Sequence, residues 1–366
     1  MDFDFHPFED IAEKISAGQR LSFEDGVRLY QSEDLPVLGA LAQEVRRRLN
    51  GRRVVYSLNL HLNYTNLCAD NCRFCSFAKK PGEEGGYVLN PGEIASAVRE
   101  AVMEWQINEV HLVGGHHPTW GLEDYLAILR AIRSAGPSVY IKAFAAPEIA
   151  HIARLSGLAP AELLRRFQAE GLNGLPGGGA EIFSEEVRKK ICPNKISAGE
   201  WLEIHRLAHG LGLRTNATML YGHIENGEDR VEHVLRLRAL QDETGGFQAF
   251  IPLCYQARRN ALESLGTCGG FTDLKVFAVS RLLLDNVPHL KAHWVGLGLK
   301  MAQVSLSFGV DDLGGVHLGE KIFRETGETP RAELDRGGME RLIRSAGYEP
   351  CLVDSAYSVA SENADG

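Results

Sequence analysis

Three of the seven cysteines lie within one stretch of eight residues, in the spacing C-x3-C-x2-C. A four-iron cluster is normally held by four cysteine thiolates. Three thiolates from one short loop therefore leave one iron without a protein ligand, and an open metal position of this kind can be filled by a substrate or a cofactor. The spacing of Cys68, Cys72 and Cys75 accordingly predicts a 4Fe-4S cluster with one open iron.

A zinc site, a redox dithiol or a disulfide framework would account for less of the sequence. A structural zinc site needs four ligands, and no second ligand pair at zinc-site spacing follows the loop. A redox dithiol would use Cys72 and Cys75 and leave Cys68 unexplained. A disulfide framework is not expected in a long chain with few cysteines. The other four cysteines are widely separated, so we expect no second cluster.

The cysteine loop at 68–75 resembles that of the radical S-adenosylmethionine (SAM) superfamily. In that superfamily the amino and carboxylate groups of SAM fill the open iron. One electron from the cluster then breaks the sulfonium bond and gives a 5′-deoxyadenosyl radical. The resemblance implies a 4Fe-4S cluster and SAM as the cofactors of this chain. It also implies that Phe74 packs near the adenine, where the superfamily has an aromatic or apolar ring.

The composition is that of an ordinary globular protein, with 366 residues of which 44% are hydrophobic and 24% are charged. The net charge of −9 argues against a broad nucleic-acid-binding surface and against a polybasic membrane patch. No apolar run approaches the roughly 20 residues needed to span a bilayer, and the acidic N-terminus lacks the pattern of a signal peptide. We therefore expect a cytoplasmic enzyme without nucleic-acid or membrane partners, and we make no prediction of its oligomeric state.

The residues before about position 56 predict a helical extension. The S-x-x-D pattern at 22–25 is typical of a helix N-cap, and apolar residues at 35–49 recur at helical spacing. Beyond this extension, short β-rich segments alternate with amphipathic helices, which is typical of a parallel sheet. We expect strands at 54–63, 109–113, 139–144, 173–175, 214–221, 247–253, 289–295 and 310–313.

This alternation predicts an α/β protein built on a (β/α)8 TIM-type barrel, the fold of the radical SAM superfamily. We expect an N-terminal helical extension at 1–56, the barrel at 57–320 and a C-terminal cap at 321–366. The active sites of such barrels lie at the carboxyl ends of the strands. The glycine- and histidine-rich segments that follow the predicted strands therefore mark the candidate site.

Four residues within or after predicted strands match SAM-contacting positions of the superfamily. Gly114 and Gly115 match a glycine pair that lets the backbone approach the methionine ammonium. Glu181 follows a glycine run, and its carboxylate is either an acceptor for the SAM ribose or ammonium or the acid that caps a helix. Thr218 begins a segment, 218–225, that resembles the adenine-contact motif of the fifth strand.

From about 59 to 308, successive motifs of the chain resemble those of the aminodeoxyfutalosine synthases of menaquinone biosynthesis. The identifying motifs are VGGHH at 113–117, KAF at 142–144 and NATMLY at 216–221. Several other motifs are shared with two sister families, the cyclic dehypoxanthine futalosine synthases and the deazaflavin-forming synthases. Activity like that of these sister enzymes is the alternative prediction.

The resemblance implies a radical addition. The 5′-deoxyadenosyl radical would add to the enol-ether double bond of 3-[(1-carboxyvinyl)oxy]benzoate. The aryl group would then migrate and carbon dioxide would leave, which gives 6-amino-6-deoxyfutalosine. SAM would be consumed as a co-substrate, and an unidentified electron donor would reduce the cluster.

The implied substrate carries two carboxylates, so its pocket needs hydrogen-bond donors inside an acidic protein. Candidate donors at predicted strand ends are His116, His117, Asn216 and His223, with Lys142 and Lys195 as further cations. One of the histidines is also a candidate base around the decarboxylation. A histidine can equally be a structural residue, and the sequence leaves that alternative open.

Overall fold

The computed structural model describes residues 5–316, 318–327 and 334–358, so residues 328–333 and 359–366 of the predicted C-terminal cap lie outside the described residues. The strands are β1 (Arg53–Ser57), β2 (Asn59–Leu62), β3 (Glu109–Leu112), β4 (Tyr140–Ala143), β5 (Gly174–Leu175), β6 (Arg214–Tyr221), β7 (Phe247–Cys254), β8 (His289–Leu290), β9 (Asp312–Gly315) and β10 (Glu349–Leu352). The α-helices are α1 (Glu9–Ser16), α2 (Phe23–Gln31), α3 (Leu35–Asn50), α4 (Pro91–Trp105), α5 (Leu122–Ala135), α6 (Ala146–Ser156), α7 (Pro160–Ala169), α8 (Glu185–Ile191), α9 (Ala198–Gly210), α10 (Gly227–Thr244), α11 (Gly270–Leu283), α12 (Trp294–Leu297), α13 (Leu299–Ser305) and α14 (Arg336–Ser345). Short 3-10 helices cover Glu263–Leu265, Leu306–Phe308 and Arg324–Thr326.

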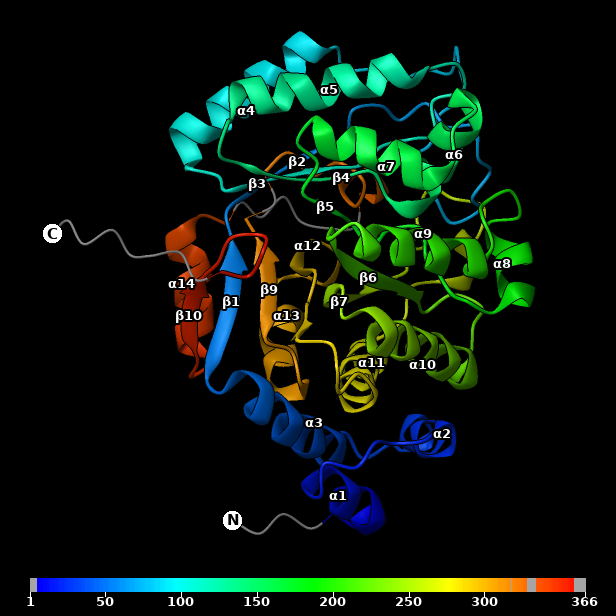
Figure 1. The fold of residues 1–366 in the computed structure, drawn as a ribbon. Coiled ribbons are helices and arrows are strands. Elements are labelled where there is room, and N and C mark those ends of the chain that lie inside the picture. The colour runs from blue at the N-terminus through cyan, green and yellow to red at the C-terminus, as the bar shows by residue number, and fades with distance from the viewer. Residues whose placement is uncertain (1–4, 317, 328–333, 359–366) are drawn as a thin grey trace, which may run out of the picture.

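The strands form a parallel barrel. Strands β2 to β8 pair in sequence order in one sheet. An isolated bridge between Lys291 and Asp312 joins the end of that sheet to β9, and β9 pairs with β1, which continues into β2. The pairings therefore return to their starting point, and Figure 1 shows the helices arranged around the outside of the strands. The predicted (β/α)8 fold is confirmed.

The barrel strands alternate between two environments, because successive side chains of a strand point to opposite faces. Leu60 of β2 and Val110 of β3 are buried among apolar residues of the core. Their neighbours along the strands, His61 and His111, line a cavity inside the barrel. These cavity-lining side chains are polar, which indicates that the barrel interior is a binding site and not only an apolar core.

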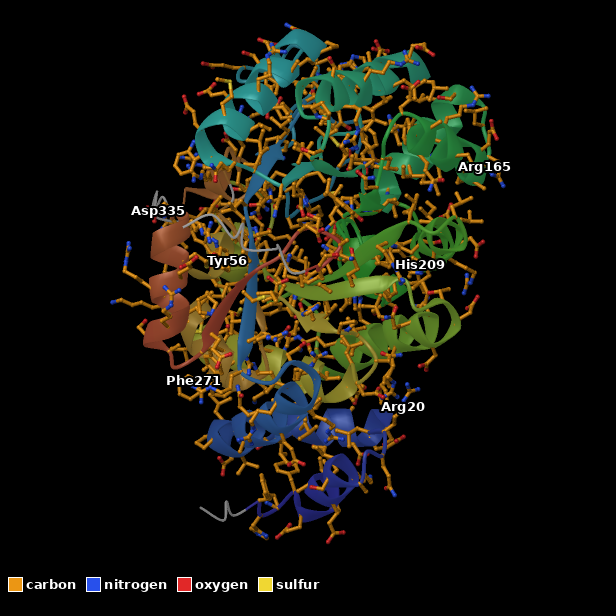
Figure 2. The ribbon with its side chains drawn as sticks, turned by 60° about the vertical axis from the view of Figure 1, so that its left-hand side comes forward. Arg20, Tyr56, Arg165, His209, Phe271 and Asp335 are labelled. Carbon is orange, nitrogen blue, oxygen red and sulfur yellow. The ribbon has the colours of Figure 1, made fainter. Side chains whose placement is uncertain are left out.

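The N-terminal helices α1 to α3 lie at the bottom of Figure 1, where α2 packs against α10 and α3 packs against α11. Arg20, labelled in Figure 2, pairs with Asp242 at 2.6 Å and with Asp285 at 2.9 Å. The guanidinium of Arg46 is buried and donates to the carbonyl oxygen of Val310 at 2.9 Å. These contacts tie the extension to elements near the C-terminal half of the barrel.

The C-terminal segment packs against the same strand on which the extension ends. Strand β10 pairs in parallel with β1, and Tyr56 of β1 donates to Glu340 of α14 at 2.5 Å (Figure 2). The division into segments 1–56, 57–320 and 321–366 stays a prediction. None of the helices in the described part of the chain is both long and apolar enough to cross a membrane.

Candidate active site

A cavity of about 330 Å³ opens at the carboxyl ends of the barrel strands. Most residues predicted from the sequence line it: Cys68, Cys72, Phe74, Cys75, Gly114, Gly115, His116, Glu181, Asn216 and Thr218. They come from the loops after β2, β3 and β5 and from β6 itself. The barrel thus brings together groups that are up to 150 residues apart in the chain.

Backbone hydrogen bonds to neighbouring segments fix the shape of the cysteine loop. The amide of Ala69 donates to the carbonyl of His116 at 2.8 Å, and the amide of Arg73 donates to the carbonyl of Ile191 at 2.8 Å. The loop is therefore held by the segment after β3 on one side and by the end of α8 on the other. All seven cysteines are free, so the three loop thiols are available as ligands.

The donor set suits an iron–sulfur cluster. Three thiols that approach one cavity from one loop form a set of soft ligands. Burial raises the pKa of the Cys68 and Cys72 thiols. Thiols in such surroundings become thiolates when a cationic metal centre supplies the balancing charge.

The glycine pair packs directly against the cysteine loop. A Cβ atom on Gly115 would lie 2.3 Å from the carbonyl oxygen of Leu67, and one on Gly114 would lie 2.7 Å from the ring of Tyr64. The amide of Gly115 also donates to the carbonyl of Thr65 at 2.8 Å. Only glycine allows the backbone-to-backbone approach at position 115, which brings the segment after β3 against the cysteine loop.

Glu148, near the start of α6, is a cavity residue that the sequence reasoning missed. Its carboxylate accepts from the amide of Ala145 at 2.8 Å, from the amide of Gly114 at 3.2 Å and from the hydroxyl of Tyr64 at 2.8 Å. Burial raises its pKa to about 7, because these hydrogen bonds offset only part of the desolvation. The available signal was a glutamate directly after a helix-starting proline, in the pattern of a capping box.

An ion pair lies beside the cysteine loop. The ammonium of Lys195 donates to Glu181 at 2.5 Å and lies 5.5 Å from the centre of the Phe74 ring. Burial disfavours the ammonium, but Cys72 and Glu181 outweigh it and hold the pKa of Lys195 well above its usual range. A fixed cation in this place offsets negative charge on a cluster held by thiolates.

Of the three predicted catalytic histidines, His116 is the one that lines the cavity. Its Nδ1 lies 3.1 Å from Oδ2 of Asp70, and its backbone amide donates to the sulfur of Cys68 at 3.4 Å. Burial lowers the pKa of His116, so the ring is neutral at neutral pH. Amide-to-sulfur hydrogen bonds are one means by which proteins tune iron–sulfur clusters.

The other two predicted catalytic histidines lie outside the cavity. The His117 ring stacks on Trp120, with ring centres 4.7 Å apart. The His223 side chain is fully buried, and its Nδ1 lies 2.9 Å from Glu225. Catalytic roles for His117 and His223 stay predictions.

Two further side chains that were predicted to contact a ligand interact with other groups of the protein. Thr218 lines the cavity and donates its hydroxyl to the carbonyl of Gly177 at 2.7 Å. Lys142 is buried with its ammonium 3.5 Å from Glu109 and lies beyond the main cavity, in a smaller one.

Three histidines inside the barrel were also missed. His61 comes from β2, His111 from β3, and His293 lies just after β8, and all three line the cavity. Each follows a polar residue two positions earlier, in the pairs Asn59/His61, Glu109/His111 and Lys291/His293. This repeated polar-x-His pattern within predicted strands was the available signal, because residues two apart share one face of a strand.

Two family models match the chain. The radical SAM superfamily model matches residues 62–237, and the model of the CofH/MqnC C-terminal region matches residues 244–365. In fold, the chain is similar to methylornithine synthase (PylB), with a TM-score of 0.74 at 17% identity over 93% of this chain and 97% of that one. It is also similar to the FeFe-hydrogenase maturase HydG from Carboxydothermus hydrogenoformans, with a TM-score of 0.76 at 18% identity over 96% and 81% of the two chains.

The barrel, the cysteine-lined cavity and the superfamily match together define a radical SAM enzyme, whose cofactors are a 4Fe-4S cluster and SAM and whose substrate is a small molecule. The chain is 45% identical to the aminodeoxyfutalosine synthase of Thermus thermophilus, over 95% of this chain and 94% of that protein. It is 44% identical to that of Streptomyces coelicolor, over 96% and 94%. The cyclic dehypoxanthine futalosine synthase of S. coelicolor is 37% identical, over 95% and 88%. The chain belongs to the aminodeoxyfutalosine synthase family.

Proposed function

We propose that this enzyme joins the 5′-deoxyadenosyl group of SAM to 3-[(1-carboxyvinyl)oxy]benzoate, with aryl migration and loss of carbon dioxide, to give 6-amino-6-deoxyfutalosine. The observation that carries this proposal is the cavity of about 330 Å³, which holds the cysteine loop and the barrel histidines together. One end of the cavity suits the cofactors, and the other offers donors for an anionic aromatic substrate. The membership in the family makes this reaction the expected one.

When bound at such a cluster, SAM supplies a 5′-deoxyadenosyl radical after one-electron reduction. In this proposal Cys68, Cys72 and Cys75 hold the cluster. The electron donor is a separate reductant, and the location of the enzyme is the cytoplasm. The contribution of the chain is to orient two reactants in one cavity and to keep competing hydrogen donors away from them.

The residues around the glycine pair form the proposed cradle for SAM. Gly114 and Gly115 let the backbone approach the methionine ammonium, and Glu148 holds that backbone in place through the amide of Gly114. Glu181 offers the carboxylate oxygen that Lys195 does not engage. Adenine contacts are assigned to the side chains at the neighbouring wall, Phe74 and Thr218.

His116 is the proposed proton-handling group, because it is the histidine of the loop region that faces the cavity. Asp70, at 3.1 Å from its Nδ1, orients the ring and leaves Nε2 for a ligand. For His223 a positioning role is the alternative to the predicted catalytic role, because its Nε2 lies 3.1 Å from the carbonyl oxygen of Leu220, which lines the cavity.

The test is product analysis after anaerobic reconstitution of the cluster. Reduced enzyme incubated with SAM and 3-[(1-carboxyvinyl)oxy]benzoate should give a product whose mass contains both the adenosyl and the benzoate groups. Stoichiometric free 5′-deoxyadenosine without that product would contradict the proposal and favour hydrogen abstraction, the chemistry expected of the cyclising sister enzymes. Slow SAM cleavage alone would show that the substrate is wrong.

A further inference from the structure

The inner end of the cavity is lined by three histidines from separate strands, which we call the histidine floor: His61, His111 and His293. The rings of His61 and His111 stack with centres 4.5 Å apart and an angle of 13° between their planes. Nε2 of His61 lies 3.1 Å from the side-chain nitrogen Nδ2 of Asn59, and the ring centres of His293 and Phe323 lie 4.7 Å apart. Contacts with neighbouring side chains therefore hold the imidazole rings of the floor in defined orientations.

The charged groups packed around the floor are largely balanced among themselves. Lys291, after β8, lies 3.2 Å from Asp312 of β9. Lys142 of β4 lies 3.5 Å from Glu109 of β3, whose other oxygen lies 3.6 Å from His111. Both of these carboxylates thus already face a lysine.

The other ionisable neighbours among the described residues already have partners, and the amide of Phe323 donates to Glu320 at 2.9 Å. Tyr357 donates its hydroxyl to Asp312 at 2.6 Å. Glu320, at the wall beside Phe323, is buried, and burial raises its pKa. Asn216 lines the cavity from β6 with its side chain almost fully buried and its Oδ1 without a hydrogen-bond partner among the described residues. Among the described residues, the floor is thus surrounded by polar groups and by carboxylates that already face a lysine or a hydrogen-bond donor.

Burial keeps these histidines neutral in the free protein. It lowers the pKa of His293 to about 3 and that of His61 well below its usual value, and it also lowers the pKa of His111. The neighbouring imidazoles and Lys291 lower the pKa of His61 and His293 further, whereas Glu109 raises the pKa of His61 and His111 without offsetting the burial. A carboxylate bound against the floor would raise the pKa of the nearest histidine, because it supplies the negative charge that a buried imidazolium requires.

We propose that the histidine floor is the binding subsite for an aryl carboxylate, and that one of its imidazoles takes up a proton when the ligand binds. The identity of the ligand rests on the proposed function, in which the benzoate end of the substrate lies at the floor and the enol ether faces the cysteine loop. A buried carboxylate needs a paired cation, and protonation of a histidine provides one without moving any lysine from its existing partner.

Proton uptake is measured by titration calorimetry on the anaerobically reconstituted holoenzyme. The probes are 3-hydroxybenzoate and its neutral counterpart 3-hydroxybenzamide, each titrated at one pH in two buffers of different ionisation enthalpy. We expect uptake of about one proton per bound benzoate and none for the amide. The Kd of the benzoate should rise by up to about tenfold per pH unit on the alkaline side.

Two variants test whether the floor histidines are the residues that bind the carboxylate. His61→Gln and His293→Gln should each weaken benzoate binding at least about tenfold and leave benzamide binding nearly unchanged. The control is His209→Gln, because His209 (labelled in Figure 2) lies on α9, pairs with Thr215 and Thr244 and is not among the residues that line the cavity. Cluster absorbance and melting temperature show that each variant is folded.

Equal binding of the acid and the amide by the wild-type enzyme, or benzoate binding without proton uptake, would overturn the proposal. These measurements need no turnover. An enzyme that binds benzoate as expected but gives no adenosyl product would therefore contradict the proposed function and leave the carboxylate subsite standing. An enzyme that gives the product but shows no proton uptake would contradict the subsite alone.

Discussion

The cysteine loop with its surroundings and the histidine floor face the same cavity, but different groups dominate them: a close ion pair at the loop and uncharged imidazoles at the floor. Around the loop, ionisable groups are paired at short range, with Lys195 at 2.5 Å from Glu181 and His116 at 3.1 Å from Asp70. At the floor, stacked imidazoles are neutral, and the nearby lysines are engaged with carboxylates. The loop region is built around a permanent charged cofactor, whereas the floor suits a ligand whose charge arrives and leaves with each turnover.

The largest expected effect lies at the loop. Cys75→Ala should abolish product formation and lower the iron and sulfide content after reconstitution, because two thiolates from the loop cannot replace three. Binding of 3-hydroxybenzoate at the floor should survive, which would separate the two regions directly. Cys351→Ala is the matched control, since Cys351 lies on β10 and outside the cavity. Full activity of Cys75→Ala would remove the cysteine loop from the mechanism.

The next largest effect is expected at the glycine pair. In Gly115→Ala the new methyl group would meet the backbone of Leu67 at 2.3 Å, so the cysteine loop must move. We expect a loss of about 100-fold in kcat/KM, because small displacements of reacting groups have effects of this size. Gly210→Ala serves as the control, since a Cβ there meets nothing within 4 Å. Wild-type kinetics in Gly115→Ala would show that the loop position is not critical.

Removal of the cation beside the loop should have a smaller effect. Lys195→Met leaves Glu181 without its partner and takes a positive charge away from Cys72. We expect a more negative reduction potential of the cluster and about a tenfold lower rate with a fixed reductant. Spectroscopic redox titration measures the potential, and Lys300→Met, at an exposed position, is the control. An unchanged potential would show that the ion pair serves only the packing of the loop.

Glu148 predicts a pH effect on stability. Its pKa is raised to about 7 in the folded protein, mainly by burial, so the folded state binds this proton more tightly than the unfolded chain. The stabilisation of the folded state by this proton is present at low pH and is lost as the pH rises through about 7. Melting temperatures between about pH 5.5 and 8 should therefore fall more steeply in the wild type than in Glu148→Gln. Glu84→Gln, on an exposed loop, should retain the wild-type slope.

The smallest effect on catalysis is expected at His223, which lies behind the cavity with its side chain fully buried. His223→Asn should lower the melting temperature by a few degrees and change kcat/KM by less than about threefold. His116→Asn, at the cavity wall, should reduce kcat/KM far more. A large loss of activity in His223→Asn without loss of stability would give His223 a catalytic role. It would also show that residues outside the cavity can matter as much for activity as residues that line it.

Most of the cavity residues that could be predicted lie in short segments of the chain. Cys68, Cys72, Phe74 and Cys75 belong to one loop, and Gly114 to His116 follow one strand. Local spacing identified the cysteines, and the resemblance to the superfamily identified Phe74 and the glycine pair. His117 shows the limit of such reasoning, because its place beside His116 in the sequence does not give it the same surroundings: its ring turns to Trp120.

By itself, the sequence determined the barrel fold, the three-thiol loop and the family, because each depends on short-range spacing or on the regular alternation of strands and helices. Only the tertiary structure decided that Glu148 holds the glycine pair and that the floor histidines converge. His61 and His111 meet because β2 and β3 pair in a register that sets them side by side, and His293 joins them across the closed barrel. Strand register and barrel closure are sums of many weak long-range contacts, and no local pattern of residues encodes them.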